Sequence, residues 1–308
     1  MRILIVYSRN SGKIAPFIQE QGDALSKLGV EVAYFPIEGK GLCGYLKNRK
    51  QLLSMINVFL PDLIHAHYGL SGLLANLQRK IPVITTYHGS DIDNIKIFPL
   101  SRLNMILAAH NIFVSKKNRH KSHQTRNQSL IPCGVDINLF QPISKVEARQ
   151  LLNLNADKKY ILFAGAFANS VKNPNLAKSA ISFFQDVELI ELKGYSRHEV
   201  ALLLNAVDLL LLTSFSEGSP QIIKEAMACN CPIVSVPVGD VEDVASGING
   251  CYISSYQLTD IVAEIKQALT FGGRTQGRNR IIEMGLDSDS ISAKILNVYN
   301  KVLSKGKQ

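Results

Sequence analysis

The sequence predicts an α/β protein built from two doubly wound parallel sheets. Short apolar runs rich in β-branched residues recur along the 308 residues, and segments with helical periodicity lie between most of them. Strands that alternate with helices in this way run parallel, with helices on both faces of the sheet. The expected strands are RILIVYS, VEVAYFP, DLIHAH, PVITTYH, NIFVS and SLIPCG, and then YILFAGA, VELIELKG, VDLLLLTS, CPIVSVP and GCYISS.

A chain of 308 residues is long enough for two domains. The segment GVDINLFQPISKVEA, after Pro132, carries turn residues and a helix restart near Ser144. We therefore expect an N-terminal domain at 1–145 and a C-terminal domain at 146–286. A last amphipathic helix with a basic end is expected within 287–308.

The net charge of +9 lies entirely in the first half of the sequence. Residues 1–142 contain 17 Lys and Arg against 8 Asp and Glu, whereas the remainder contains 17 against 17. Basic clusters of this kind fit either solvated helix faces or contact with anionic lipid head groups or an acidic acceptor. They lack interleaved aromatic residues, so no nucleic acid partner is expected. The clusters are Lys47, Arg49 and Lys50; Arg79 and Lys80; and Lys116, Lys117, Arg119, Lys121 and Arg126.

Several common classes of protein are not expected from the sequence. No apolar run of about 18 residues and no signal-peptide cleavage pattern is present, which predicts a cytoplasmic protein, placed at the inner face of the membrane if the basic clusters bind lipid. The five cysteines include no Cys-x-x-Cys pair, so neither a disulfide framework nor a structural zinc site is expected. The absence of a G-x-G-x-x-G fingerprint argues against a nicotinamide or flavin cofactor.

Two glutamates, Glu217 and Glu225, stand eight residues apart across a turn that opens a helix. The preceding run LLLLTS resembles a buried strand, and Ser219 and Pro220 suit the N-cap and first helical positions. The helix dipole and unpaired amides at such a start suit phosphate oxygens, although Pro220 has no N–H. Glu225 is placed to accept hydrogen bonds from two ribose hydroxyls, and Glu217 would face the group attached beyond the phosphates. Spacing alone equally allows a dipole-balancing Glu217 and a solvated Glu225.

This segment resembles a known signature. EGSPQIIKEAMACNCPIV is similar to the E-x7-E motif of retaining glycosyltransferase family 4. The resemblance implies that Glu225 binds the ribose of a nucleotide-sugar donor and that Glu217 approaches the donor sugar. The turn that would hold the distal phosphate consists of Gly218, Ser219, Pro220, Gln221 and Ile222.

The resemblance extends over most of the chain. DLIHAHYG, TTYHGSD and IPCGVDINLFQP match motifs of the family's first domain, with Cys133 where the family has Asn. LKGYSRHEVALLLNAVDLLLLTSFSEG matches the second domain. The implied architecture is GT-B, with two Rossmann-like domains facing across a cleft and the final helix packing back on the N-terminal domain, which would bind the acceptor.

Residues just past strand ends are the remaining site candidates, because ligands of open α/β sheets bind there. His88 corresponds to the family's sugar-contacting histidine, whereas we interpret His65 and His67 as structural. Gly12, after the first strand, lies in a loop that contacts the donor in the family. Lys172 matches the family's diphosphate-binding lysine, but Ala166 stands where an arginine is usual.

Asp91-Ile92-Asp93 resembles the metal-binding D-x-D of the other large glycosyltransferase fold. Its position just past the TTYH strand, in the presumed acceptor domain, favours helix or turn capping instead. No metal and no cofactor other than the donor is expected, since GT-B enzymes generally need none.

The sequence therefore predicts a retaining glycosyltransferase that moves a hexose or related sugar from a nucleoside diphosphate to an acceptor hydroxyl. A lipid-linked or glycan acceptor in surface polysaccharide assembly, and peripheral contact with an anionic membrane, are expected from the basic N-terminal half. Two alternatives remain: a noncatalytic nucleotide-sugar-binding scaffold subunit, motivated by Ala166, and a sugar-nucleotide epimerase or hydrolase on the same fold.

Overall fold

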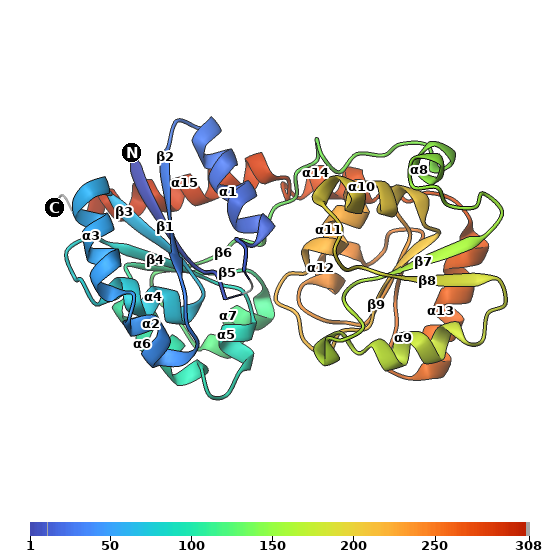
Figure 1. The fold of residues 1–308 in the computed structure, drawn as a ribbon, viewed down its shortest axis with the longest axis horizontal. Coiled ribbons are helices and arrows are strands. Elements are labelled where there is room, and N and C mark those ends of the chain that lie inside the picture. Colours follow the sequence, from blue (N-terminus) through green and yellow to red (C-terminus); the bar gives the residue numbers. More distant parts are fainter. Residues whose placement is uncertain (11, 306–308) are drawn as a thin grey trace. The chain divides into compact units, whose positions relative to one another are not determined.

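The computed structural model describes residues 1–10 and 12–305 (Figure 1). Contacts divide the chain into two compact units. One comprises Met1–Gly134 together with Ser288–Gln308, and the other comprises Val135–Asp287. Each unit contains one parallel sheet with helices, so the predicted class of two parallel α/β sheets is confirmed.

The first unit has a six-stranded sheet in the order β2-β1-β3-β4-β5-β6. Every neighbouring pair is parallel, and β1 begins its pairing with Arg2 opposite Glu31 of β2 and with Ile3 opposite Leu63 of β3. The unit contains β1 (Arg2–Ser8), α1 (Pro16–Lys27), β2 (Glu31–Ile37), α2 (Gly41–Leu46), α3 (Arg49–Phe59), β3 (Leu63–His67), α4 (Gly69–Asn76), β4 (Val83–Tyr87), α5 (Ser90–Asp93), α6 (Phe98–Leu107), β5 (His110–Phe113), α7 (Lys116–Ser122), β6 (Gln128–Leu130) and α15 (Ser288–Lys305).

Alternate residues of β1 pack on opposite faces of this sheet, as the twofold repeat of a strand requires. Leu4 and Val6 join a buried cluster with residues of α3 and α4. Helices α1 and α15 pack on each other and cover the other face (Figure 1). Because both faces are covered, β1, β3, β4 and β5 are buried along most of their length, which explains their continuous apolar runs.

The second unit has a five-stranded parallel sheet in the order β11-β10-β9-β7-β8. Helices α8 and α10 pack together, as do α9 and α13, and α11 and α14. The unit contains α8 (Lys145–Leu151), β7 (Lys159–Phe163), the 3₁₀ helix η1 (Ser170–Lys172), α9 (Pro174–Ile181), β8 (Val187–Glu191), α10 (Arg197–Ala206), β9 (Leu209–Leu212), α11 (Gln221–Ala228), β10 (Ile233–Ser235), α12 (Val241–Ala245), β11 (Cys251–Ile253), α13 (Leu258–Phe271) and α14 (Gly277–Glu283).

Both sheets contain a point where the order of strands along the chain reverses. In the first unit β1 lies between β2 and β3, and in the second unit β7 lies between β8 and β9. The loops that follow the two strands at such a point leave the carboxyl edge in opposite directions and open a crevice between them, where ligands of doubly wound sheets bind. The loops after β1 and β3, and after β7 and β9, are therefore the places where a site is expected.

The division between the units falls at Gly134 and Val135, earlier than the predicted boundary at 145/146. The segment after Val135 belongs to the second unit because side chains of that unit hold it. The Arg278 guanidinium donates hydrogen bonds to the carbonyl oxygens of Ile137 and Phe140, at 2.9 and 2.8 Å. These long-range bonds could not be read from turn residues alone. The last helix, α15, is part of the first unit, where it packs on α1.

Candidate functional site

The loops after β7 and β9 are tied to each other at the carboxyl edge of the second sheet. Thr213, the first residue after β9, donates its Oγ1 hydrogen to the carbonyl oxygens of Lys172 and Asn173, both at 3.0 Å. The amide of Phe215 donates to the carbonyl oxygen of Val171 at 2.9 Å. Thr213 is fully buried, so these bonds are shielded from water. The two loops thus form one connected surface at the point where the strand order reverses.

Lys172 and Glu217 meet on this surface. The Lys172 Nζ lies 2.6 Å from Glu217 Oε1, although the residues are 45 positions apart in the sequence. Their side chains are 24% and 16% exposed, so the pair is shielded but open on one side. Gly165 makes room for the stem of the lysine, because a Cβ there would lie 2.6 Å from Lys172 Cγ. Two residues selected from separate motifs are therefore in direct contact.

The start of α11 differs by one residue from the prediction. Pro220, with φ −64° and ψ 113°, is the N-cap, and the first helical residue is Gln221. The Ser219 side chain does not cap the helix. Its hydroxyl instead donates to Asp240 Oδ2 at 2.7 Å and accepts from Lys224 Nζ at 2.5 Å. The amide groups at the start of α11, with the positive end of its dipole, follow Gly218 after only Ser219 and Pro220.

A buried ion pair supports this turn from beneath. Lys224 is fully buried, and its Nζ lies 2.8 Å from Oδ2 of Asp240, which is 4% exposed. Gly239 lies against the turn with φ +64°, and a Cβ at this position would come within 2.8 Å of the Gly218 carbonyl oxygen. The Gly239 backbone and the Lys224–Asp240 pair therefore restrict the movement of the turn. Lys224 and Asp240 were not among the residues selected from the sequence.

Glu225 is not a solvated helical acid. It is 2% exposed, and its Oε1 accepts a hydrogen bond from Arg197 Nη1 at 2.8 Å. Burial raises the pKa of Glu225, and the nearby Arg197 guanidinium opposes that rise. The guanidinium also stacks over the Phe140 ring, with its carbon 4.7 Å from the ring centre. A carboxylate held in this way has a fixed orientation and can exchange its partner for ligand hydroxyls.

Arg197 is a further candidate that the sequence alone did not indicate. It is the first residue of α10, placed there by a capping box in which the Ser196 hydroxyl accepts from Glu199 N and the Glu199 carboxylate accepts from Ser196 N. The S-x-x-E pattern in SRHEV is the signal that locates this helix start. The contact of Arg197 with Glu225 depends on tertiary packing, so the sequence could not show it.

Three histidine rings stack where β3 and β4 end in the first unit. His65 and His67 have ring centres 4.7 Å apart, and those of His67 and His88 are 5.2 Å apart, each pair at 23°. The His67 Nδ1 lies 2.9 Å from His88 Nε2. Both ring nitrogens of His65 are in hydrogen bonds, with the Thr86 hydroxyl at 2.7 Å and the Tyr299 hydroxyl at 2.6 Å. His65 is structural, as expected, and it connects α15 to the row of rings that ends at His88.

Burial keeps these rings neutral at physiological pH. It lowers the pKa of His65 and of His88 to about 3, and the pKa of His67 well below its ordinary value. The neighbouring rings act in the same direction on His67 and His88. A neutral His88 can donate or accept a hydrogen bond without adding positive charge.

We expect this burial to make stability depend on pH. Above pH 6.5 the His65 ring is neutral in both states and contributes no pH dependence. Below pH 6.5 the unfolded chain binds a proton that the folded protein excludes down to about pH 3. The free energy of unfolding then decreases by about 1.4 kcal/mol for each unit by which the pH is lowered, for one such histidine. The free energy of unfolding, measured with urea between pH 7.5 and 5.5, should decrease less steeply with falling pH in His65→Gln than in the wild type. Equal slopes would contradict the assignment.

The other sequence candidates in the first unit lie in the loop after β1 and in the short helix α5. Gly12 follows β1 with φ +89°, and its amide donates to the Arg9 carbonyl oxygen at 2.9 Å. Its neighbour Ser11 lies outside the described residues. Asp91 accepts hydrogen bonds from the amides of His88, Gly89 and Gly69, at 3.2, 3.0 and 3.1 Å, so its carboxylate closes turns as predicted. Asp93 pairs with Lys121 at 2.6 Å.

The predicted site residues thus fall into two groups. Gly12 and His88 lie in the first unit, and Lys172, Glu217, the Gly218–Ile222 turn and Glu225 lie in the second. Among residues 1–10 and 12–305, no cluster of three or more His, Cys, Asp or Glu has an arrangement that could hold a metal ion. Within the same residues, no helix combines the length and apolar character needed to cross a bilayer.

Two family models match the chain. The model described as Glycosyltransferase Family 4 matches residues 5–139, and the model described as Glycosyl transferases group 1 matches residues 150–270. The first match lies mainly in the first unit and the second lies within the second unit, where it includes every site candidate of that unit.

Individual proteins show more distant similarity. The D-inositol 3-phosphate glycosyltransferase of Mycobacterium marinum is 24% identical over 268 residues, which cover 70% of this chain and 57% of the relative. The putative teichuronic acid biosynthesis glycosyltransferase TuaC of Bacillus subtilis is 26% identical over 215 residues, which cover 60% and 55% of the two chains. The chain thus spans little more than half the length of these relatives. Sucrose-phosphate synthase from Thermosynechococcus elongatus has a similar fold, with a TM-score of 0.86 at 17% identity, covering 99% of this chain and 100% of the other.

Proposed function

The chain belongs to the group 1 glycosyltransferases of family 4 and has their GT-B fold, and we propose that it transfers a sugar from a nucleoside diphosphate to an acceptor hydroxyl. One observation carries the proposal most directly. The Lys172–Glu217 pair, at 2.6 Å, stands at the reversal point of the second sheet, beside the start of α11. A cation, a carboxylate and a helix start in this position suit a diphosphate joined to a sugar.

The donor would lie along three features of the second unit. Glu225 binds the ribose hydroxyls, taking them in place of or beside Arg197 Nη1, which now lies 2.8 Å from its carboxylate. The turn from Gly218 to Ile222 binds the distal phosphate. Lys172 exchanges its contact with Glu217 for the diphosphate, and Glu217 is then available to the sugar hydroxyls. Lys172 would then lie at the diphosphate and Arg197 at the ribose end of the donor.

The reaction proposed is transfer with retention of the anomeric configuration. The bond between the anomeric carbon and the diphosphate oxygen breaks while the acceptor oxygen bonds to the same face of that carbon. The acceptor proton passes to the departing phosphate oxygen. Negative charge develops on that diphosphate, and fixed charges aimed at it lower the barrier most effectively. Lys172 and the start of α11 supply that stabilisation, and no metal ion is required in this proposal.

His88, neutral and in the first unit, is assigned to orient the sugar, and Gly12 to allow close backbone approach.

We further propose a lipid-linked or glycan acceptor of surface polysaccharide assembly. The basic balance of residues 1–142 supports this class, because polyprenyl-type carriers and anionic membranes present phosphates. The similarity to a putative teichuronic acid biosynthesis glycosyltransferase points the same way. The enzyme would then act at the inner face of the membrane as a peripheral protein.

A donor screen tests the proposal. The purified protein is incubated with UDP-, GDP-, ADP- and dTDP-sugars and a membrane lipid extract, with and without EDTA, and products are identified by mass spectrometry. We expect one donor to give a new glycolipid and its free nucleoside diphosphate, in EDTA as well. Glu217→Ala is expected to lose this product, and His88→Ala to form less of it.

The alternatives give different results in the same screen. Released free sugar without an acceptor would identify a hydrolase, and an altered sugar nucleotide would identify an epimerase. Donor binding without turnover, with every extract, would identify a noncatalytic subunit. Transfer by Glu217→Ala at the wild-type rate would overturn the assignment of that residue.

A further inference from the structure

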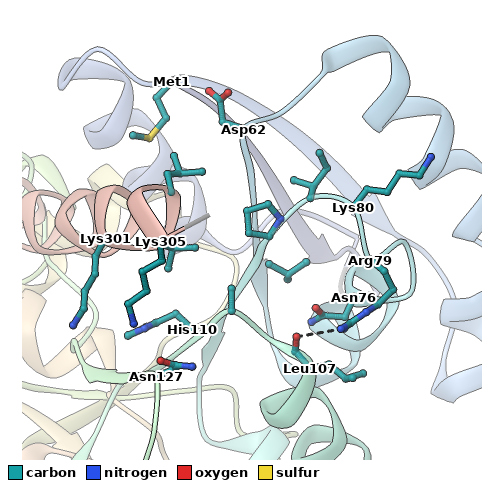
Figure 2. Close-up of a pocket in the computed structure, with 16 residues that line it drawn as sticks. Met1, Asp62, Asn76, Arg79, Lys80, Leu107, His110, Asn127, Lys301 and Lys305 are labelled. Carbon is teal, nitrogen blue, oxygen red and sulfur yellow. Dashed lines mark hydrogen bonds between the residues drawn. The ribbon is translucent and has the colours of Figure 1, made fainter. Parts of the chain in front are cut away.

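A second, basic pocket lies in the first unit, at the edge of the sheet opposite the histidine row. Its cavity volume is about 790 Å³. The walls come from the last turns of α15, from the segment between α4 and β4, and from the starts of β4 and β5 (Figure 2). We call it the amino-edge pocket, because Met1, Asp62, Val83, His110 and Asn127 stand at or just before the first residues of β1, β3, β4, β5 and β6.

The strand direction separates this pocket from the candidate site. His67 and His88 lie at the carboxyl ends of β3 and β4, whereas Asp62 and Val83 lie at their amino ends. A five-residue strand spans about 15 Å at roughly 3.3 Å per residue, and both strands are buried along their whole length. A ligand in the amino-edge pocket would therefore not reach the residues proposed for catalysis.

Positive charge dominates the lining of the pocket. Lys301 and Lys305 project from α15 toward His110, and Arg79 stands on the other wall, where the Lys80 side chain points away from the pocket (Figure 2). Within residues 1–10 and 12–305, none of these four cations forms a salt bridge. The acidic residue of the lining, Asp62, already accepts a hydrogen bond from the Arg2 amide at 2.7 Å.

Helix termini explain only part of this charge. Lys305 lies in the last turn of α15, where a cation balances the helix dipole. Arg79 donates to the carbonyl oxygen of Leu107, the last residue of α6, at 3.5 Å. Lys301 has no such role, and three cations around one cavity repel each other unless an anion joins them.

His110 shows the effect of that repulsion. It is 5% exposed, its Nε2 pairs with the Ser129 hydroxyl at 2.9 Å, and no described residue is bonded to its Nδ1. Burial lowers the pKa of His110 to about 4, and Lys301 and Lys305 lower it further in the same direction. The imidazole is therefore neutral at pH 7. It can donate an N–H hydrogen bond to an anion without adding a positive charge beside the lysines.

The remaining lining residues indicate which groups of a ligand, besides an anion, the pocket could contact. Pro82, Val83, Ala109 and Val302 supply apolar wall, and the side-chain amides of Asn76 and Asn127 lie at the cavity margin (Figure 2). A concave site of this volume, with apolar wall beside charged and amide groups, has the size of a small-molecule site. We propose that the amino-edge pocket binds a phosphate ester, with its phosphate held by Lys301 and Lys305 and with Arg79 on the opposite wall. The ester is either a free small molecule or a lipid head group.

The test measures ligand binding through the NMR signals of His110, so its result does not depend on the donor site. The full chain is labelled at histidine and titrated by NMR at pH 7 with glycerol 3-phosphate, and separately with inorganic pyrophosphate. Co-sedimentation with phosphatidylglycerol vesicles, compared with phosphatidylcholine vesicles, forms the second arm. Each is repeated with the Lys301→Gln/Lys305→Gln double variant and with Lys294→Gln, an exposed residue of the same helix outside the pocket.

We expect a soluble phosphate ester to shift the His110 resonances and to raise the pKa of that ring, since a bound anion offsets the two lysines. The double variant should bind about tenfold or more weakly, as loss of charge-assisted hydrogen bonds predicts, and Lys294→Gln should match the wild type. Binding to phosphatidylglycerol vesicles alone, lost in the double variant, would identify a lipid head group as the source. Unmoved His110 resonances together with equal binding to phosphatidylglycerol and phosphatidylcholine vesicles would overturn the proposal. Equal binding by the double variant and the wild type would overturn it too. Both lysines are exposed, so the double variant is expected to fold.

Discussion

Lys172→Ala is expected to reduce kcat for sugar transfer by about 10²- to 10³-fold, the usual cost of removing one group that stabilises developing charge. The lysine lies 2.6 Å from Glu217 at the carboxyl edge of β7 and β9, where a diphosphate would lose its sugar. The Glu217 carboxylate holds the amine at this edge before the donor binds. The measurement is single-turnover transfer with the donor found in the screen, which separates chemistry from product release.

The pairing of Lys172 with Glu217 makes a double-mutant cycle informative. If Glu217 contacts the sugar and Lys172 the diphosphate, each single substitution slows transfer, and the Glu217→Gln/Lys172→Ala variant loses less than the product of the two losses. Lys266→Ala removes an exposed lysine of α13 in the same unit and should leave the rate unchanged. A rate for Lys172→Ala within about threefold of the wild type would show that the lysine only orders the loop, since removing one charge-stabilising donor costs far more.

Much of this site could be predicted from the sequence, because local patterns are enough to place strand ends. The runs LLLLTS and YILFAGA locate β9 and β7, and the loop after each run lies at a carboxyl edge. Nothing local indicates that β7 and β9 are neighbours, so the contact between Lys172 and Glu217 appears only once the strand order is known.

Other features depend on packing that no periodicity reveals. Lys80 and Lys301 are far apart in the sequence, in a basic cluster and in the final amphipathic helix, and only the docking of α15 brings both to one pocket. Lys224 appears in the sequence as an ordinary polar residue of QIIKEAMA, yet α11 is buried on the side that carries it. In each case tertiary contacts, and not the local sequence, determine the surroundings of the charge.

Lys224→Met is the substitution with the largest expected effect on stability. The methionine has nearly the same length and fits the buried space, but it leaves the Asp240 carboxylate without its cation at 4% exposure. Asp240 Oδ1 already has no hydrogen-bond partner among the described residues, so Oδ2 would keep only the Ser219 hydroxyl. Breaking a buried pair from one side costs about 3–5 kcal/mol. The turn from Gly218 to Pro220 should lose its support, and donor affinity should fall with it.

The double variant Lys224→Met/Asp240→Asn separates the charge from the shape of the site. It contains no buried charge at positions 224 and 240, so it should recover more than half of the stability lost in Lys224→Met. Asp240→Asn alone should be destabilised, because Lys224 is then unpaired. The chain has no tryptophan, and two units can unfold separately. Hydrogen exchange of the α11 amides, read by mass spectrometry, therefore measures the local effect, with the exposed Lys266→Met as control. Protection of α11 in Lys224→Met equal to that of the wild type would mean that packing of Ile222 and Ile223, not the ion pair, holds the turn in place.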